Sequence, residues 1–216
     1  MRFSNRLWCT VLAVLLFGVV AAGQKTPYVT VVVNDAVGVR PSILLRAEDE
    51  AARLFERAGI DIEWRNCGRY IQEDVEDCNV HGTNRFVLHI VRTGQTDSDS
   101  VFGVAFLGED GRGKYSDVFY DRIAETASGS DVPLVQLLAA VSAHELGHLL
   151  LGTHSHAFAG IMAARWQKQS LCKIAMGSLY FTHEQSGLMR GRLETRAFPV
   201  QMTSFGRRGL SKGREY

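Results

Sequence analysis

The chain has 216 residues, with 24 Lys and Arg against 23 Asp and Glu, and a formal net charge of +1 at pH 7. A near-neutral chain without a phosphate-binding glycine loop or an internal repeat is a poor candidate for nucleic-acid binding, so we expect no nucleic-acid partner. The length is sufficient for one domain with a sizeable hydrophobic core.

The N-terminal segment has the pattern of a secretory signal peptide. Arg2 and Arg6 are followed by an apolar run over residues 7–20 and by small residues at 21–23. We therefore expect residues 1–23 to be cleaved, a secreted or extracytoplasmic protein, and no stable membrane association after cleavage. A membrane anchor is the alternative interpretation of the same run. The rest divides into one folded domain over 24–205 and a flexible basic tail over 206–216.

The first half of this domain is predicted to be rich in strands. β-branched and alternating apolar residues predict strands at 28–34, 60–65, 86–91, 101–107 and 117–120. Apolar periodicity predicts a helix over 43–58, which Gly59 terminates. The polar segments 93–100 and 108–116 are predicted to be loops.

Three cysteines follow the signal peptide. Cys67 and Cys78 bracket a polar segment with few apolar residues to hold it in place, which favours a disulfide between them. Two reduced thiols are the alternative. Cys172 is then unpaired, and we expect it to be a buried thiol.

Residues 144–156 read His-Glu-Leu-Gly-His-Leu-Leu-Leu-Gly-Thr-His-Ser-His. Apolar residues with helical spacing precede them, and Ser130 or Asp131 before a proline predicts the start of the helix. His144 and His148 are four residues apart, so on a helix both imidazoles can reach one metal ion. Imidazole suits Zn²⁺, and Glu145 can take the proton from a zinc-bound water. The pattern predicts a zinc site rather than an accidental core helix.

The spacing from His144 to His154 matches the metzincin signature His-Glu-x-x-His-x-x-Gly-x-x-His, and the Gly160-Ile161-Met162 sequence resembles the Met-turn of that family. The resemblance implies an α+β catalytic domain over 24–205, in which a twisted mixed β-sheet packs on an N-terminal helix and the active-site helix, with a small C-terminal helical part. It also implies that Met162 lies beneath the metal. An edge strand, either 101–107 or 117–120, would line the substrate cleft.

One position departs from the metzincin signature. Leu151 stands where the family has glycine, and the glycine follows one residue later as Gly152. The delay extends the helix and rotates its exit by about 100°, which favours His156 over His154 as the third zinc ligand. A carboxylate such as Glu184 is a further alternative. The longer form is similar to that of small secreted bacterial zincins.

Beyond the Met-turn, the sequence predicts a helix but leaves oxyanion stabilisation unassigned. Thr182 to Gln185 has the pattern of a capping box that opens a helix through about residue 195. Astacin-like enzymes place a tyrosine soon after the Met-turn methionine, whereas this chain has Ala163, Ala164, Arg165 and Trp166. Arg165 is a candidate substitute, and a surface residue is the alternative.

Together these patterns predict a secreted, monomeric zinc metallopeptidase that acts on a peptide or protein substrate. Zn²⁺ is held by His144, His148 and either His156 or His154, and Glu145 is the general base. The first alternative is a zinc hydrolase of a non-peptide amide or ester. The second is a non-catalytic, zinc-stabilised secreted domain, which requires both His154 and His156 to ligate and close the site.

Overall fold

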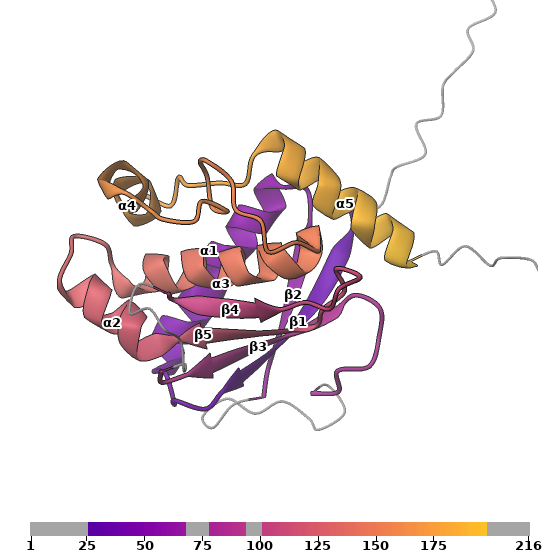
Figure 1. Ribbon diagram of the computed structural model, residues 1–216. Helices are drawn as coiled ribbons and strands as arrows, with labels where there is room; N and C mark the ends of the chain where they lie inside the picture. The colour runs from indigo at the N-terminus through magenta and orange to yellow at the C-terminus, as the bar shows by residue number, and fades with distance from the viewer. Residues whose placement is uncertain (1–25, 68–77, 94–100, 198–216) are drawn as a thin grey trace, which may run out of the picture.

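The computed structural model describes residues 26–67, 78–93 and 101–197 (Figure 1). The predicted signal peptide at 1–23 and the predicted tail at 206–216 lie outside these residues. So does most of the predicted loop over 93–100.

The centre of the fold is one five-stranded sheet with the strand order β2-β1-β3-β5-β4. β1, β2, β3 and β5 run parallel, and β4 at one edge runs antiparallel to β5. The strand bounds are β1 Tyr28–Asp35, β2 Asp61–Asn66, β3 Arg85–Val91, β4 Gly103–Phe106 and β5 Tyr115–Phe119. All five predicted strands are therefore present, with bounds shifted by one or two residues at most ends.

Two long helices, α1 (Pro41–Arg57) and α3 (Leu134–Leu151), pack against each other and against the sheet. Alternate strand residues such as Val31, Leu88 and Val118 are buried in the same core cluster as the apolar residues of these helices. α2 (Tyr120–Ser128), α4 (Lys168–Ala175) and α5 (His183–Ala197) pack around α3. The predicted α+β class, with a mixed sheet on two helices and a small C-terminal helical part, is confirmed.

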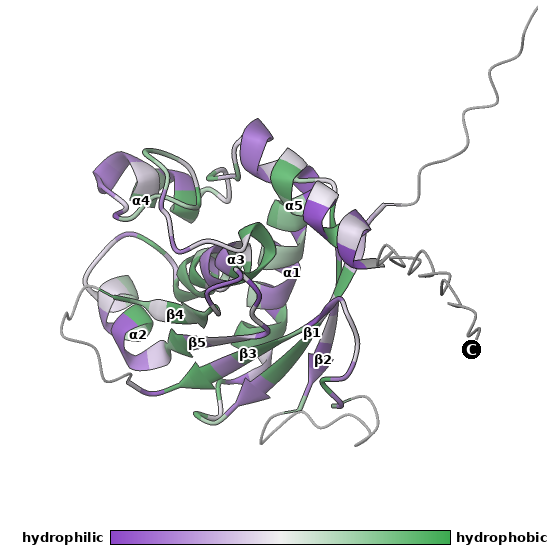
Figure 2. Cartoon of the chain, turned by 45° about the vertical axis from the view of Figure 1, so that its right-hand side comes forward, coloured by the Kyte–Doolittle hydropathy of each residue, from purple (hydrophilic) through white to green (hydrophobic). Residues whose placement is uncertain are grey.

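α3 is the central helix of the domain, and nearly all of its residues are buried. Its length and hydropathy would suit a membrane span, but 83% of it is buried within the fold. Figure 2 shows the hydrophobic colouring concentrated in α3 and the central strands, with hydrophilic residues prominent on α2, α4 and α5. The helix begins after Pro133 without a side-chain cap, so the predicted capping by Ser130 or Asp131 is wrong.

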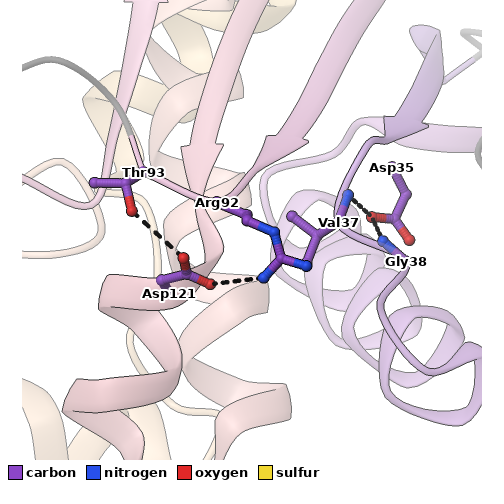
Figure 3. A network of polar contacts seen from close by, with 6 residues as sticks. All are labelled: Asp35, Val37, Gly38, Arg92, Thr93 and Asp121. Atoms are coloured by element: carbon purple, nitrogen blue, oxygen red, sulfur yellow. Dashed lines mark hydrogen bonds and ion pairs between the residues drawn. The ribbon is translucent and has the colours of Figure 1, made fainter.

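The turns at the ends of β1 and β3 are held by acidic side chains (Figure 3). The buried carboxylate of Asp35 accepts hydrogen bonds of 2.7 to 3.0 Å from the backbone N–H groups of residues 37–39, which lead into α1. At the other turn, Asp121 at the start of α2 accepts a bond from Thr93 and lies 4.0 Å from the guanidinium of Arg92. The three bonds to the buried Asp35 carboxylate fix the entry into α1, whereas the exposed Asp121 pair contributes little.

The cysteine predictions have different outcomes. Cys67 and Cys78 form the predicted disulfide, and the segment between them, 68–77, lies outside the described residues. Cys172 is a free thiol, but it is exposed, so the expectation of a buried thiol is wrong. It lies on α4, a short helix that the sequence analysis did not predict, and α4 turns Ile174 rather than Cys172 toward the core.

The predicted capping box at the start of α5 is present, with both of its reciprocal hydrogen bonds formed. The backbone N–H of Thr182 donates to Oε1 of Gln185 at 2.9 Å, and the backbone N–H of Gln185 donates to Oγ1 of Thr182 at 3.2 Å. This reciprocal pair satisfies two donors that the first turn of a helix leaves unpaired. The helix that it opens, α5, packs on α3.

Candidate metal centre

His144 and His148 lie on one face of α3 with their Nε2 atoms 3.1 Å apart. The Nδ1–H of His144 donates to the carbonyl oxygen of Ile161 at 2.7 Å. The Nδ1–H of His148 donates to the carbonyl oxygen of Thr153, also at 2.7 Å. Each bond fixes the tautomer, so that both Nε2 lone pairs are available to a metal ion.

The chain returns to α3 through a left-handed turn at Gly152, whose φ is +66°. Its N–H donates to the carbonyl oxygen of His148 at 2.8 Å, which ends the helix. The glycine that the metzincin signature has one residue earlier stands here at 152, in the left-handed conformation, and Leu151 remains helical.

This late turn brings His156 over the motif histidines. The His156 ring centroid lies 5.2 Å from that of His144 and 4.9 Å from that of His148. Ligand atoms of His144, His148 and His156 all lie within 4.8 Å of one another, close enough to hold one metal ion. His154 is exposed, its ring lies 6.4 Å from that of His148, and it is outside this group. Glu184, at the start of α5, is also outside it.

The electrostatic setting keeps the three histidines neutral. Burial, followed by the charges of His148 and His156, lowers the pKa of His144 to about 4. Burial is also the main reason why the pKa values of His148 and His156 are lowered. Neutral imidazole is the form that binds metals, so this cluster is prepared for a cation at neutral pH.

Met162 lies directly under the motif helix and is fully buried. A Cβ added to Gly147 would lie 2.5 Å from Sδ of Met162, so the absence of a side chain at position 147 allows this contact. The turn that contains Met162 is held in place because the backbone N–H of Ala157 donates to the carbonyl oxygen of Met162 at 2.7 Å. This bond joins the segment after the histidines to the turn at residues 160–162.

Glu145 lies between the motif histidines and the edge strand β4. Its side chain is nearly inaccessible, and burial raises its pKa to about 8. A cation bound by the histidines would lower that value by charge attraction. A Cβ at Gly103 of β4 would lie 2.7 Å from Cγ of Glu145 and 2.6 Å from the carbonyl oxygen of Asp117. Glycine at 103 therefore allows β4 to cross directly over the carboxylate.

A cleft of about 750 Å³ opens over these groups. One wall is residues 101–105, which include residues 103–105 of β4, and the other is residues 163–166. Glu145 and the histidines 144, 148, 154 and 156 also line the cleft. Of the two candidate edge strands, 101–107 contains β4 and lies at the sheet edge, whereas 117–120 overlaps β5, which is an interior strand.

Trp166 joins the two walls and contacts the metal centre. Its indole N–H donates to the carbonyl oxygen of Ile161 at 3.2 Å, the same oxygen that orients His144. Its ring stacks on Phe102, which precedes β4, with centroids 6.4 Å apart. Neither aromatic residue was predicted as a site residue, and neither was Gly103. A glycine within a strand pattern was the available signal for a close backbone approach.

The comparisons with known proteins support the fold. No family model and no curated protein match the sequence. The zinc-dependent peptidase from Methanocorpusculum labreanum is similar in structure, with a TM-score of 0.52 at 15% identity over 74% of this chain and 99% of that one. Archaemetzincin from Methanopyrus kandleri has a TM-score of 0.49 at 16% identity over 80% of this chain and 99% of that one. The first likeness shows a shared α+β architecture.

Proposed function

We propose that this protein is a secreted zinc-dependent metallopeptidase with His144, His148 and His156 as the metal ligands and Glu145 as the general base. The observation that carries the proposal is the convergence of three histidine ligand atoms within 4.8 Å beside a buried carboxylate. The similar fold of a protein described as a zinc-dependent peptidase supports it.

The donor set fits Zn²⁺. Three neutral imidazoles form a common zinc ligand set in hydrolases, and two of them are oriented by bonds from Nδ1 to backbone carbonyls. Among the described residues, no fourth His, Cys, Asp or Glu joins the group. This favours a catalytic site over the closed, purely structural site that needs His154 as well.

When bound, zinc acts as a Lewis acid that polarises a substrate carbonyl and acidifies water. Glu145 accepts the proton of the attacking water and returns it to the leaving amine. Without a metal ion, burial raises the pKa of the Glu145 carboxyl to about 8. A bound cation lowers this pKa toward neutrality, where a carboxyl can both accept and donate a proton. Met162 supports the ligands from below through its contact with Gly147.

The edge strand beside the cleft favours a peptide substrate over a small amide or ester. β4 is an edge strand, so its outer side has backbone groups that can pair with an extended peptide. The same strand crosses Glu145 at Gly103, which brings a paired peptide backbone next to the general base.

The proposal of secretion rests on two features. The signal-peptide pattern over 1–23 is one, and the Cys67–Cys78 disulfide, which is typical of oxidising compartments, is the other. Secretion is tested by expressing the full chain in a bacterial host and sequencing the N-terminus of the protein recovered outside the cytoplasm. A chain that keeps residues 1–23 and stays in the cytoplasm contradicts the proposal.

The function is tested with a peptide library whose products are read by mass spectrometry, using zinc-loaded wild type and Glu145→Gln. We expect Glu145→Gln to bind zinc like the wild type and to lose at least about 99% of turnover, since a general base contributes about 10²- to 10⁴-fold. Glu184→Gln, a matched change at an exposed position outside the histidine group, should retain both properties. Undiminished cleavage by Glu145→Gln would refute the mechanism.

A further inference from the structure

Arg165 lies on the wall of the cleft that follows the Met-turn. It is exposed, and it lines the same cavity as His144, His148 and His156. It comes three residues after the buried Met162, so its backbone continues directly from the support of the metal centre.

The backbone around Arg165 is anchored on both sides. Before it, Ala163 donates a backbone hydrogen bond to Gly160 at 3.2 Å and pairs with Ala157 through a β-bridge. After it, the indole of Trp166 is bonded to the carbonyl oxygen of Ile161 and lies edge-on to His144, with centroids 5.7 Å apart. Arg165 is therefore presented from a fixed position, which lowers the entropic cost of binding a ligand.

The guanidinium of Arg165 has no partner among the described residues, which distinguishes it from several other arginines. Arg122 donates to the carbonyl oxygen of Val101 at 2.8 Å, and Arg192 donates to that of Gly111 at 3.0 Å. Among the described residues that line the cleft, the acidic one is Glu145, which is buried beside the histidines. Arg165 thus contributes a positive charge to the cleft, and no anionic side chain in the part of the chain that the structure describes pairs with it.

We propose that Arg165 binds a carboxylate of the substrate, so that the cleft selects peptides with an acidic group close to the scissile bond. The inference rests on the proposed peptidase function and specifies its substrate class. A guanidinium offers two parallel N–H donors that match the two oxygens of a carboxylate. That carboxylate is either an Asp or Glu side chain or the free C-terminus of a short peptide.

The test uses zinc-loaded enzyme and peptides of one sequence that differ at a single group. In one kind of pair, a single position flanking the cleavage site is Glu in one peptide and Gln in the other, each flanking position is tested in turn, and the C-terminus is amidated. The other pair has a neutral side chain there and a free or amidated C-terminus close to the cleavage site. We expect one pair to show a preference of about tenfold in kcat/KM for the acidic member, as for a charge-assisted hydrogen bond in a partly desolvated cleft. The pair that responds identifies the source of the carboxylate.

Substitutions at Arg165 should change this ratio in graded fashion. Arg165→Ala should bring the ratio close to one, Arg165→Lys should leave an intermediate ratio, and Arg165→Glu should reverse the preference toward a Lys-containing peptide. Lys168→Ala is the matched control, because it removes an exposed cation outside the cleft lining and should keep the wild-type ratio. Zinc content should stay the same in all variants.

Calorimetric titration of zinc-loaded Glu145→Gln with the same peptides measures binding without turnover. The acidic peptide should bind about tenfold more tightly than its neutral partner, and the added Arg165→Ala change should abolish that difference. Equal kcat/KM and equal binding within both pairs, or a preference that survives Arg165→Ala, overturns the Arg165 inference while cleavage itself still supports the peptidase. A library without any cleaved peptide refutes the proposed function instead, and the binding titration then decides on Arg165.

Discussion

Replacing Gly103 with alanine should displace the strand that crosses Glu145. The new Cβ would lie 2.6 Å from the carbonyl oxygen of Asp117, and 2.7 and 2.9 Å from Cγ and Cδ of Glu145. The Asp117 oxygen belongs to the backbone of the interior strand β5, and Glu145 is buried on α3, so β4 has to move outward. Overpacking of this kind costs about 1–3 kcal/mol, which exceeds the gain of about 0.5–1 kcal/mol from removing a glycine.

For a domain of this size, a net loss near 1 kcal/mol lowers Tm by about 2–4 °C. Because displacement of a reacting group by about 1 Å can cost about 10²-fold in rate, kcat/KM should fall by about 10- to 100-fold, while one zinc per chain is retained. Thermal unfolding, zinc analysis and peptide cleavage measure the three effects. Gly187→Ala is the control, since its Cβ would meet no atom within 4 Å, and Tm should be equal or higher. Wild-type Tm and activity in Gly103→Ala would refute the packing argument.

Three further predictions concern polar contacts and the burial of His144. Asp35→Ala removes a buried acceptor of three backbone N–H groups and should lower the free energy of unfolding, measured by urea titration, by about 3 kcal/mol. Asp35→Asn should lower it by less. Equal stability of the wild type and both variants contradicts this prediction. Trp166→Phe keeps an aromatic ring but loses the hydrogen bond from the indole N–H to the carbonyl oxygen of Ile161. Zinc binding, measured by competition with a chelator, should weaken about fivefold. Unchanged zinc affinity would show that this bond does not support His144. The third prediction uses zinc-free Glu145→Gln, because this variant lacks the opposing titration of the Glu145 carboxyl. The pKa of His144 is about 4 in the folded state and about 6.5 in the unfolded state, so the unfolded state takes up the proton first as the pH falls. The free energy of unfolding should therefore fall by about 3 kcal/mol between pH 6.5 and pH 4. A flat profile would show that His144 is not shielded.

The sequence predicted the strands, the long helices and the motif face because their signals are local. Four-residue spacing places His144 and His148 on one face of α3, and the delayed Gly152 correctly indicated a later return of the chain. Thr182 and Gln185 are a similar case, because a capping box is complete within four residues.

The features that were missed depend on contacts between distant segments. α2 and α4 are only 9 and 8 residues long and each buries a single residue, Ile123 and Ile174 respectively, so their apolar patterns are too short to stand out in the sequence. Cys172 was misplaced for the same reason, since the orientation of α4 is set by its packing on α3. The stacking of Trp166 on Phe102 joins segments 64 residues apart in the sequence, and local periodicity carries no information on such a pair.

Zinc binding by the wild type, His156→Ala and His154→Ala tests the central claim most directly. We expect one zinc per chain in the wild type and in His154→Ala, and a loss of affinity of at least about 100-fold in His156→Ala, because removal of one of three ligands leaves an incomplete site. Loss of zinc from His154→Ala with retention in His156→Ala would contradict the ligand set. A wild-type protein that binds no zinc would refute the metallopeptidase proposal as a whole.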